Sequence, residues 1–196
     1  EFYRKIEKSQ SSIIIFAKKE KKKNLLIYDS INKILIKNNL IAPKLINQKY
    51  HSNFIEVSDL GKITALDYIK KNKNKFVIFE KIIKVLIDLQ KIKTKKIKNF
   101  YNKLYNVPIY SNKLLFNEAK LFCDWYVPEN IKKNKIKINK KLKIKIKNLL
   151  KNLKLKNRIL VHRDFHVSNL MLFKKKLCII DSQDAVIGNE AYDLAS

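Results

Sequence analysis

Glycine is nearly absent from this sequence: only Gly61 and Gly188 occur among its 196 residues. The chain therefore contains no P-loop motif and no Gly-x-Ser-x-Gly nucleophile elbow, and it also lacks a His-Glu-x-x-His zinc motif. These absences exclude a P-loop nucleotidase, an α/β-hydrolase and a zincin-type protease within this chain. If the protein has a glycine-rich loop that covers phosphates, that loop is expected to precede Glu1.

Cysteines and long apolar runs are also scarce. Cys123 and Cys178 stand far apart and have no Cys-x-x-Cys partner, so we expect neither a disulfide framework nor a zinc site. Cys178 lies within an apolar run and is predicted to be buried as a small hydrophobic side chain. No apolar run approaches the ~18–20 residues that a membrane helix needs, so no membrane span is expected.

Arginine supplies only three of the 44 basic residues, although the net charge is +27. A surface that reads nucleic-acid phosphates is expected to use arginine for bidentate contacts. Lys, Asn and Ile dominate the chain, and all three have A/T-rich codons, so genome composition is a sufficient explanation of the charge. We therefore predict no specific nucleic-acid partner. A non-catalytic, Lys-rich module that binds nucleic acid or a membrane surface remains the alternative from another class.

The most informative stretch is 159–196, which reads as an apolar strand, a polar loop, a hairpin and the start of a helix. Asp164 and Asn169 lie five positions apart in the loop, and Asp181 directly follows an apolar run. This layout is typical of phosphoryl transfer from a nucleotide, in which one carboxylate accepts the proton of the attacking hydroxyl. We predict that role for Asp164, and we predict that Asn169 and Asp181 bind Mg²⁺ beside the phosphates of ATP.

The run His-Arg-Asp at 162–164, followed by Asn169, resembles the signature of protein kinases. The sequence departs from that signature at His166, where protein kinases usually carry Lys, and at Ser-Gln in 182–183. The whole pattern, His-x-Asp-x-His-x-x-Asn followed by Ile-Asp and Tyr-Asp-Leu-Ala, is similar to the aminoglycoside phosphotransferase and choline kinase group. This resemblance implies a protein-kinase-like fold and phosphorylation of a small molecule.

Within that group, 162–171 together with 180–196 looks closest to bacterial kinases that phosphorylate N-acetylmuramate and N-acetylglucosamine at the anomeric hydroxyl. The resemblance implies a place in the recycling of cell-wall sugars. An ATP-using enzyme with reduced cysteines is expected in the cytoplasm. His162 belongs to the catalytic loop and is expected to hold it rather than react. His166 is expected either to contact substrate or phosphate or only to pack. Asp193 resembles an aspartate that pins this loop.

The N-terminal part reads as an incomplete small lobe of the kinase-like fold. Strands are predicted at 1–8, 11–17 and 53–57, and a helix at 24–40. In that fold a strand lysine contacts the nucleotide phosphates, but 13–16 contains no lysine, so none is assigned. Asp29, the only acidic residue of the predicted helix, is a candidate for the ion-pair partner of such a lysine, but a solvated side chain is the favoured expectation.

The linker between the two lobes is expected at the end of the strand 53–57. In a kinase-like fold adenine binds this linker through backbone groups, so the residue types there are weakly constrained. Three residues are predicted by position to bind the nucleotide: Glu56, Val57 and Ser58. Gly61 follows in an Asp-Leu-Gly run and is expected to occupy a turn with positive φ.

A second informative stretch is 114–127, which contains the only tryptophan of the chain. A plain amphipathic helix explains its apolar residues, but it explains less well why Trp125 stands next to Asp124 and near Glu118. The stretch resembles the Glu-x-x-x-Phe-x-x-Trp-Tyr segment of the acetylhexosamine kinases. That resemblance implies a sugar-binding role for these three residues.

The remaining segments read as a mostly helical large lobe. Helices are predicted at 63–71 and 76–92, a loop against the core at 101–110, and one basic amphipathic helix within 132–156. The chain is therefore expected to have an α+β, protein-kinase-like two-lobe fold. The predicted lobes are a partial N-lobe at 1–58 and a helical C-lobe at 59–196. In the resembled family, the C-lobe is longer at its C-terminal end. The open alternatives are another acceptor, such as an aminoglycoside, choline or an amino-alcohol, and a fragment without activity.

Overall fold

The computed structural model describes residues 1–8, 10–131, 133–152, 156 and 158–196. Its contacts divide the chain into two compact units. The main unit comprises Glu1–Pro108 and Arg158–Ser196, and the helical unit comprises Ile109–Asn157. This division does not coincide with the lobe boundary predicted after Ser58, which remains a prediction.

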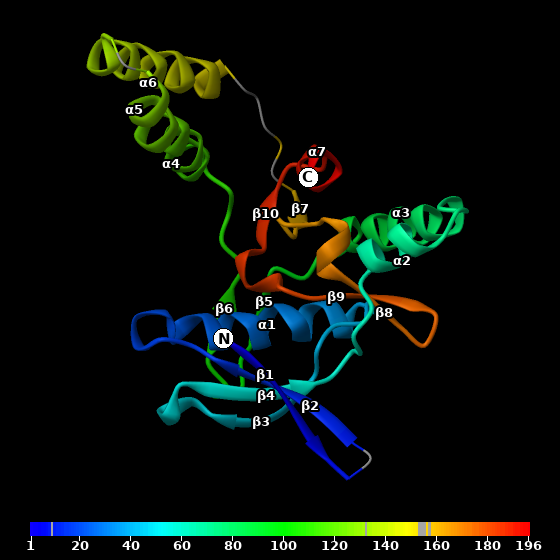
Figure 1. The fold of residues 1–196 in the computed structure, drawn as a ribbon. Helices are drawn as coiled ribbons and strands as arrows, with labels where there is room; N and C mark the ends of the chain where they lie inside the picture. The colour runs from blue at the N-terminus through cyan, green and yellow to red at the C-terminus, as the bar shows by residue number, and fades with distance from the viewer. Residues whose placement is uncertain (9, 132, 153–155, 157) are drawn as a thin grey trace. The chain divides into compact units, whose positions relative to one another are not determined.

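The main unit contains a four-stranded antiparallel sheet with the order β1-β2-β4-β3 (Figure 1). Its strands are β1 (Phe2–Glu7), β2 (Gln10–Phe16), β3 (Leu45–Lys49) and β4 (Phe54–Ser58). Burial alternates along β4, where Ile55 and Val57 are buried while their neighbours are partly exposed. One face of the sheet therefore packs inward, as period-two patterning requires. Strands were predicted within a residue or two of β1, β2 and β4.

Helix α1 (Lys23–Lys37) packs against both the sheet and the rest of the main unit. Near its start, Leu25 and Tyr28 join a core cluster with the sheet residues Ile15, Ile55 and Val57. Further along α1, three apolar side chains belong to the larger core cluster: Ile31, Ile34 and Leu35. This cluster also includes residues of β7, β8 and β9. In Figure 1 α1 accordingly lies between the sheet and the β8–β9 hairpin. The predicted helix at 24–40 is confirmed.

The expectation for Asp29 was wrong. Its side chain is buried and forms an ion pair with Lys33 at 2.8 Å, one turn later on α1. Burial raises the pKa of Asp29, while Lys33 and a backbone N–H of Phe100 oppose that shift. The sequence alone indicated an acidic residue on a lysine-rich helix; the packing of 96–100 against α1 removes that residue from water.

Most of the other helices and strands of the main unit lie within residues 65–90 and 159–195. They are α2 (Ala65–Lys71), α3 (Phe76–Gln90), β7 (Ile159–Val161), β8 (Leu170–Phe173), β9 (Lys176–Ile179), β10 (Val186–Gly188) and α7 (Ala191–Ala195). Short 3₁₀ turns lie at η1 (Lys19–Lys21), η2 (Tyr50–Ser52), η4 (Val167–Asn169) and η5 (Ser182–Asp184). Thr64 and Asp67 form a capping box that starts α2. The hairpin β8–β9 was predicted from sequence, whereas β10, which pairs with β7, was not.

The predicted loop at 101–110 was also wrong in part. Residues Leu104–Asn106 form β6, which pairs antiparallel with β5 (Lys96–Lys98). Both strands have only three residues, and neither shows an alternating apolar pattern long enough to signal a strand. Their pairing with one another, together with Ile97 and Tyr105 packed against the core, decides their conformation.

The helical unit consists of α4 (Asn112–Leu121), a π-helical turn η3 (Phe122–Tyr126), α5 (Val127–Asn130) and α6 (Lys135–Asn152). The side-chain amide of Asn112 donates to the carbonyl of Leu150 at 3.2 Å and joins α4 to α6. Cys123 and Val127 are fully buried. The predicted helix at 114–127 is thus confirmed with a π-helical interruption. Of the predicted 132–156 segment, Lys132 and 153–155 lie outside the described residues.

Both cysteines are free and buried, as predicted for Cys178. Burial raises the pKa of the Cys178 thiol to about 11. None of the helices in the described ranges has the length and apolarity that crossing a bilayer requires.

Candidate active site

The loop that carries Asp164 begins where β7 ends, and a buried aspartate fixes its first residues. Asp193 on α7 accepts the backbone N–H of His162 at 2.7 Å and the backbone N–H of Arg163 at 2.8 Å. Burial raises the pKa of Asp193, and these two donors oppose that shift. Arg163 has a positive φ of 77°, a conformation that costs energy for a residue with a Cβ and that these contacts maintain. Asp193 therefore pins the loop, as the sequence indicated.

His162 has a structural position and does not face solvent. The residue is 1% exposed, and its Nε2 lies 3.0 Å from the carbonyl oxygen of Ile180. Because that oxygen only accepts, Nε2 carries the proton and donates it. Burial lowers the pKa of His162, so the ring is neutral near pH 7. This geometry fits the expectation that His162 holds the loop rather than reacts.

The lowered pKa of His162 predicts a pH dependence of stability. Below its ordinary pKa of 6.5, the unfolded chain binds a proton at this residue that the folded chain does not bind. The stability that the neutral ring contributes is therefore complete above about pH 6.5 and decreases as the pH falls below it. We expect the melting temperature of the protein, measured in EDTA, to drop between pH 7.5 and 5.5 more steeply in the wild type than in His162→Asn.

His51 provides the matched control, because it is exposed in the turn η2. His51→Asn is expected to keep the wild-type dependence of melting temperature on pH. Parallel curves for the wild type and His162→Asn would show that this histidine does not titrate differently in the folded state.

Asn169 is oriented by its amide nitrogen. The Nδ2 group donates to the carbonyl oxygen of Asp164 at 3.0 Å, so the amide oxygen is left to face away from that contact. The backbone N–H of His166 donates to the same carbonyl at 2.9 Å. These bonds use the backbone of Asp164, and its carboxylate remains exposed. The loop thus presents a carboxylate and an amide oxygen, both candidates for chemistry.

Asp181 lies at the end of the β8–β9 hairpin and joins this site. Its φ is +61°, and the Nε2 of Gln183 donates to its Oδ1 at 3.0 Å. The next residue, Ser182, is fully buried and donates to Oδ1 of the buried Asn32 on α1 at 2.7 Å. This contact fixes the turn that carries Asp181. Sequence reasoning missed Asn32, because its partner lies 150 positions away.

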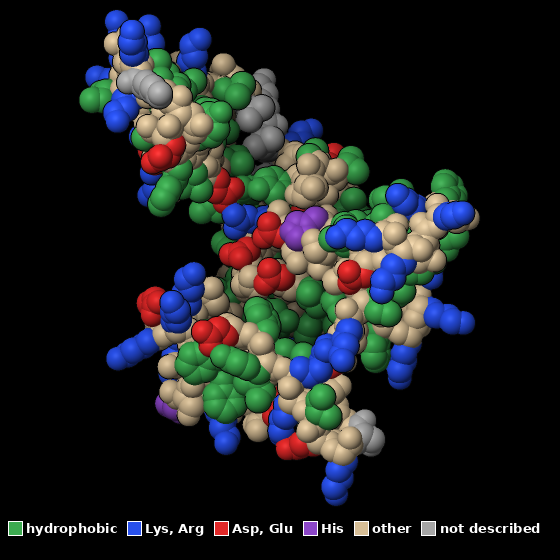
Figure 2. All heavy atoms as spheres, viewed as in Figure 1, with side chains coloured by type: hydrophobic (Ala, Val, Ile, Leu, Met, Phe, Trp, Pro, Cys, Tyr) green, Lys and Arg blue, Asp and Glu red, His purple; other side chains and the backbone are tan. Residues whose placement is uncertain are grey.

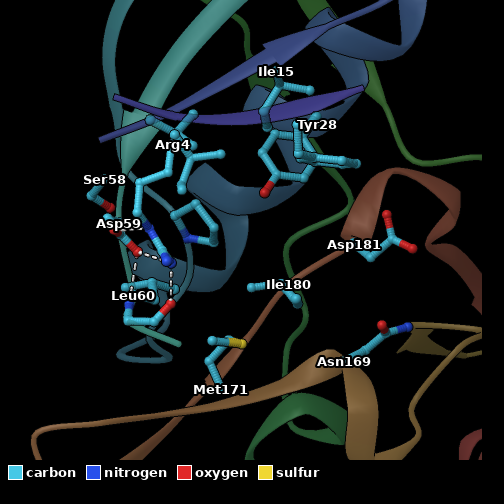
Figure 3. Close-up of a pocket in the computed structure, with 15 residues that line it drawn as sticks. Arg4, Ile15, Tyr28, Ser58, Asp59, Leu60, Asn169, Met171, Ile180 and Asp181 are labelled. Atoms are coloured by element: carbon cyan, nitrogen blue, oxygen red, sulfur yellow. Dashed lines mark hydrogen bonds and ion pairs between the residues drawn. The ribbon is translucent and has the colours of Figure 1, made fainter. Parts of the chain in front are cut away.

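A cavity of about 360 Å³ opens beside Asn169 and Asp181 (Figure 3). Its walls are largely apolar, with residues from β2, β4, the hairpin and the segment after β4: Ile13, Ile15, Val57, Leu60, Met171 and Ile180. In Figure 3 Asn169 and Asp181 lie on the side of the cavity opposite Ser58 and Asp59. An apolar slot with carboxylate and amide oxygens at one end has the form of a site for a flat base that carries phosphates.

Two of the three residues predicted at the lobe linker line this cavity. Val57 and Ser58 are among its wall residues. The side chain of Glu56 instead accepts from the Ser12 hydroxyl at 2.5 Å and lies 3.6 Å from Lys5 Nζ, and it does not line the cavity. Alternation along β4 places the side chain of Glu56 on the face opposite Val57, whereas Ser58, the last residue of the strand, borders the cavity.

Arg4, which the sequence did not single out, closes one side of the cavity. Its Nε lies 2.6 Å from Oδ2 of Asp59, and its Nη2 donates to the carbonyl of Gly61 at 2.6 Å. Burial favours the neutral acid, but Arg4 and the Gly61 N–H hold the pKa of Asp59 below its ordinary value. Gly61 has φ +93°, which confirms the predicted turn. The signal available in the sequence was the period-two spacing of Phe2 and Arg4, which both line the cavity.

The other predicted residues lie in the same loop or in the helical unit. His166 is exposed, and its ring nitrogens lie 3.0 Å from the Ser168 hydroxyl and 3.3 Å from Nδ2 of Asn169. Glu118, Asp124 and Trp125 belong to the helical unit. Their roles, and the role of His166, remain predictions.

Within the helical unit, the three residues predicted to bind sugar differ in their surroundings. Glu118 accepts a hydrogen bond from the hydroxyl of Tyr110. Asp124 forms ion pairs with Lys120 at 3.1 Å and with Lys143 of α6 at 2.5 Å, and these lysines lower the pKa of its carboxyl. Trp125 is 73% exposed on the π-helical turn. Turns of this type occur frequently at functional sites.

The surface around the loop has a distinct charge pattern. On the face of the main unit seen in Figure 2, acidic side chains and a histidine gather above a hollow with apolar walls, and lysine side chains project around it. In the part of the chain that the structure describes, no group of three or more His, Cys, Asp or Glu side chains could hold a metal ion. A cation bound by Asn169 and Asp181 would therefore need further ligands from a substrate and from water.

Solved structures with a similar fold define the fold class of this chain. The choline kinase LicA from Streptococcus pneumoniae matches 99% of this chain and 63% of its own length, with a TM-score of 0.63 and 15% identity. The aminoglycoside phosphotransferase APH(4)-Ia matches 100% of this chain and 70% of its own, with a TM-score of 0.64 and 10% identity. The chain thus has the α+β, kinase-like fold that its sequence predicted.

The chain belongs to the phosphotransferase enzyme family (APH), whose sequence pattern matches residues 39–196. Two curated relatives carry the name N-acetylmuramate/N-acetylglucosamine kinase. The Pseudomonas aeruginosa protein is 28% identical over 157 residues, which are 78% of this chain and 43% of that protein. The Neisseria meningitidis protein is 26% identical over 200 residues, which are 100% of this chain and 56% of that protein. The chain spans about half the length of the curated relatives it matches.

Proposed function

We propose that the protein is an ATP-dependent phosphotransferase that acts on a hydroxyl group of a small molecule. The observation that carries the proposal is the shared position of Asn169 and Asp181 at one end of an apolar cavity, with Asp164 in the same pinned loop. Membership of the phosphotransferase enzyme family supports it. The use of ATP, together with two free cysteines, favours the cytoplasm as the place of action.

The roles of the residues follow from their chemistry. Adenine occupies the apolar cavity beside Val57 and Leu60, and the phosphates extend toward Asp181. Asp164 accepts the proton of the acceptor hydroxyl. The oxygen of that hydroxyl forms a bond to the γ-phosphorus of ATP. The bond between that phosphorus and the ADP oxygen breaks, so ADP leaves with the electron pair. Asp193 and His162 hold the loop so that Asp164 stays aligned.

Asn169 and Asp181 suit a magnesium ion. Each offers oxygen, and the contact of Asn169 Nδ2 with Asp164 turns the amide oxygen of Asn169 outward. Hard oxygen ligands in small number are typical of Mg²⁺ in nucleotide sites, with phosphates and water completing its coordination. When bound, the ion would neutralise charge on the phosphate oxygens.

For the acceptor, we propose the anomeric hydroxyl of N-acetylmuramate or N-acetylglucosamine, in the recycling of cell-wall sugars. The names of the curated relatives support this assignment, and so does the exposed Trp125 beside Asp124. Aromatic faces pair with sugar rings, and carboxylates accept sugar hydroxyls. A second candidate class is choline or an aminoglycoside, because the structural neighbours include enzymes named for these acceptors.

The test is transfer of labelled phosphate from ATP with Mg²⁺ by the full-length protein. The acceptor panel is N-acetylglucosamine, N-acetylmuramate, glucose, choline and kanamycin. We expect transfer to the first two, with an acid-labile 1-phosphate as product. Transfer to choline or kanamycin alone would replace the sugar assignment while keeping the phosphotransferase. No transfer and no ATP binding, with salt-dependent retention on DNA or anionic lipid, would contradict the proposal.

Exchanging Trp125 provides a specific prediction about the acceptor site. Because Trp125 is 73% exposed, Trp125→Ala is expected to leave folding and ATP affinity unchanged. The loss of the aromatic face is expected to raise KM for the sugar by roughly tenfold. Glu118→Gln is expected to raise the same KM by about 10–100-fold if it accepts a sugar hydroxyl, since hydrogen bonds to charged groups contribute about 1.5–3 kcal/mol.

Ile136→Ala is the matched control for Trp125→Ala. Ile136 is 82% exposed on α6 of the same unit, so its removal also takes away exposed apolar surface. Steady-state kinetics with each substrate varied separately distinguishes the cases. An unchanged sugar KM in both Trp125→Ala and Glu118→Gln would rule out this acceptor site.

A further inference from the structure

The position of the usual phosphate-binding lysine is apolar in this chain. In a kinase-like fold that lysine lies on a strand of the small sheet and pairs with an acidic residue of the adjoining helix. Here the buried strand residue that faces α1 is Ile15, and it shares a core cluster with Tyr28 of that helix. Both residues line the nucleotide cavity, so its wall has no cation at this point. Another part of the chain has to neutralise the phosphates.

A second cavity continues the first one in the required direction. It has a volume of about 530 Å³ and shares four wall residues with the nucleotide cavity: Phe2, Ile15, Tyr28 and Asp181. Phosphates that leave the apolar cavity and meet a metal ion at Asp181 would enter this space. Gln183, which donates to Asp181, also lines it.

Two lysines line this second cavity between β2 and α1: Lys18, the residue before the turn η1, and Lys21, the last residue of that turn. The backbone N–H of Lys21 donates to the carbonyl of Lys18 at 2.9 Å, which fixes them three positions apart in a 3₁₀ turn. Both residues border the same cavity, one directly before the turn and one at its end. Lys19 belongs to the same turn but does not line the cavity.

The charges around the two lysines leave them available. The acidic residues that line the second cavity are Glu1, Glu20 and Asp181. Among the described residues, neither Lys18 nor Lys21 forms an ion pair with any of them. A polyphosphate with bound magnesium can therefore take both ammonium groups as partners, without first breaking an existing ion pair.

We propose that Lys18 and Lys21 are the phosphate-binding cations of this chain and replace the strand lysine of the kinase-like fold. The inference rests on the proposed function and assigns two binding residues to its nucleotide site. It predicts that the two lysines contribute to the binding of ATP and not to the binding of adenosine, which lacks phosphates.

The test compares two double variants of the full-length protein by calorimetry with Mg-ATP and with adenosine. Lys18→Ala/Lys21→Ala is expected to weaken Mg-ATP binding by roughly tenfold or more, since contacts between charged groups and phosphates are the strong kind. Its adenosine affinity is expected to stay unchanged. Lys19→Ala/Lys23→Ala is the control, because it removes the same charge from the same region without touching the cavity wall.

The possible outcomes distinguish a wrong assignment of the lysines from a wrong function. Equal loss of ATP affinity in both double variants would overturn the inference in favour of a general charge effect. Equal loss of ATP and adenosine affinity in Lys18→Ala/Lys21→Ala would also overturn it, because adenosine carries no phosphates. Normal ATP binding by Lys18→Ala/Lys21→Ala would also overturn it while leaving the proposed function intact. A wild-type protein that binds no ATP would overturn both. Recovery of ATP affinity in Lys18→Arg/Lys21→Arg would support the role of charge.

Discussion

Replacing Asp164 with Asn is expected to lower the rate of phosphate transfer by about 10²–10⁴-fold, the range in which a positioned general base contributes. The substitution keeps the size of the side chain but removes its ability to accept a proton. The carbonyl of Asp164, which receives the Asn169 amide, is untouched. We therefore expect the melting temperature and the affinity for Mg-ATP to stay close to those of the wild type.

The measurement is initial rate against acceptor concentration, together with a direct binding measurement for Mg-ATP. Asp88→Asn is the matched control, because it makes the same exchange on the exposed surface of α3, where Asp88 pairs with Lys91. A variant at Asp164 that keeps more than about a tenth of wild-type kcat would remove the base from the mechanism, because a general base contributes more than that. Loss of ATP binding as well would indicate that the loop had moved.

Replacing Asp193 with Ala is expected to have the second large effect, on stability. The carboxylate accepts the backbone N–H groups of His162 and Arg163, and the residue is 4% exposed. Its removal leaves two donors without acceptors, at a cost of about 1–3 kcal/mol for each buried group. Since domains are stable by only about 5–15 kcal/mol, we expect a large fall in the midpoint of urea unfolding.

Two comparisons separate this effect from a general loss of negative charge. Asp193→Asn keeps one acceptor oxygen and is expected to lie between the wild type and Asp193→Ala. Asp88→Ala removes an exposed carboxylate and is expected to shift the urea midpoint little, as surface changes usually do. An Asp193→Ala protein as stable as Asp88→Ala would mean that the loop does not depend on this anchor.

The sequence by itself predicted the spacing of the polar residues in the loop and most of the secondary structure. Asp164 and Asn169 are close in the chain, and their spacing is set by local backbone geometry, so the order of residues was enough to predict their relation. The strands of the sheet and α1 followed from period-two and helical patterns of apolar residues. The position of Asp181 after an apolar hairpin was likewise visible.

The tertiary structure decided which polar residues are buried and which partners they find. Asn32 contacts Ser182, Asp193 holds a loop 30 positions earlier in the chain, and Arg4 reaches Asp59. No local pattern specifies such pairs, because a polar side chain is solvated or buried according to what packs over it. The tertiary structure also decided the strands β5, β6 and β10. Each has three residues and forms only by pairing with another segment of the chain. A buried polar group must find a hydrogen-bond partner wherever the fold supplies one, and that requirement acts on the folded chain rather than on its sequence.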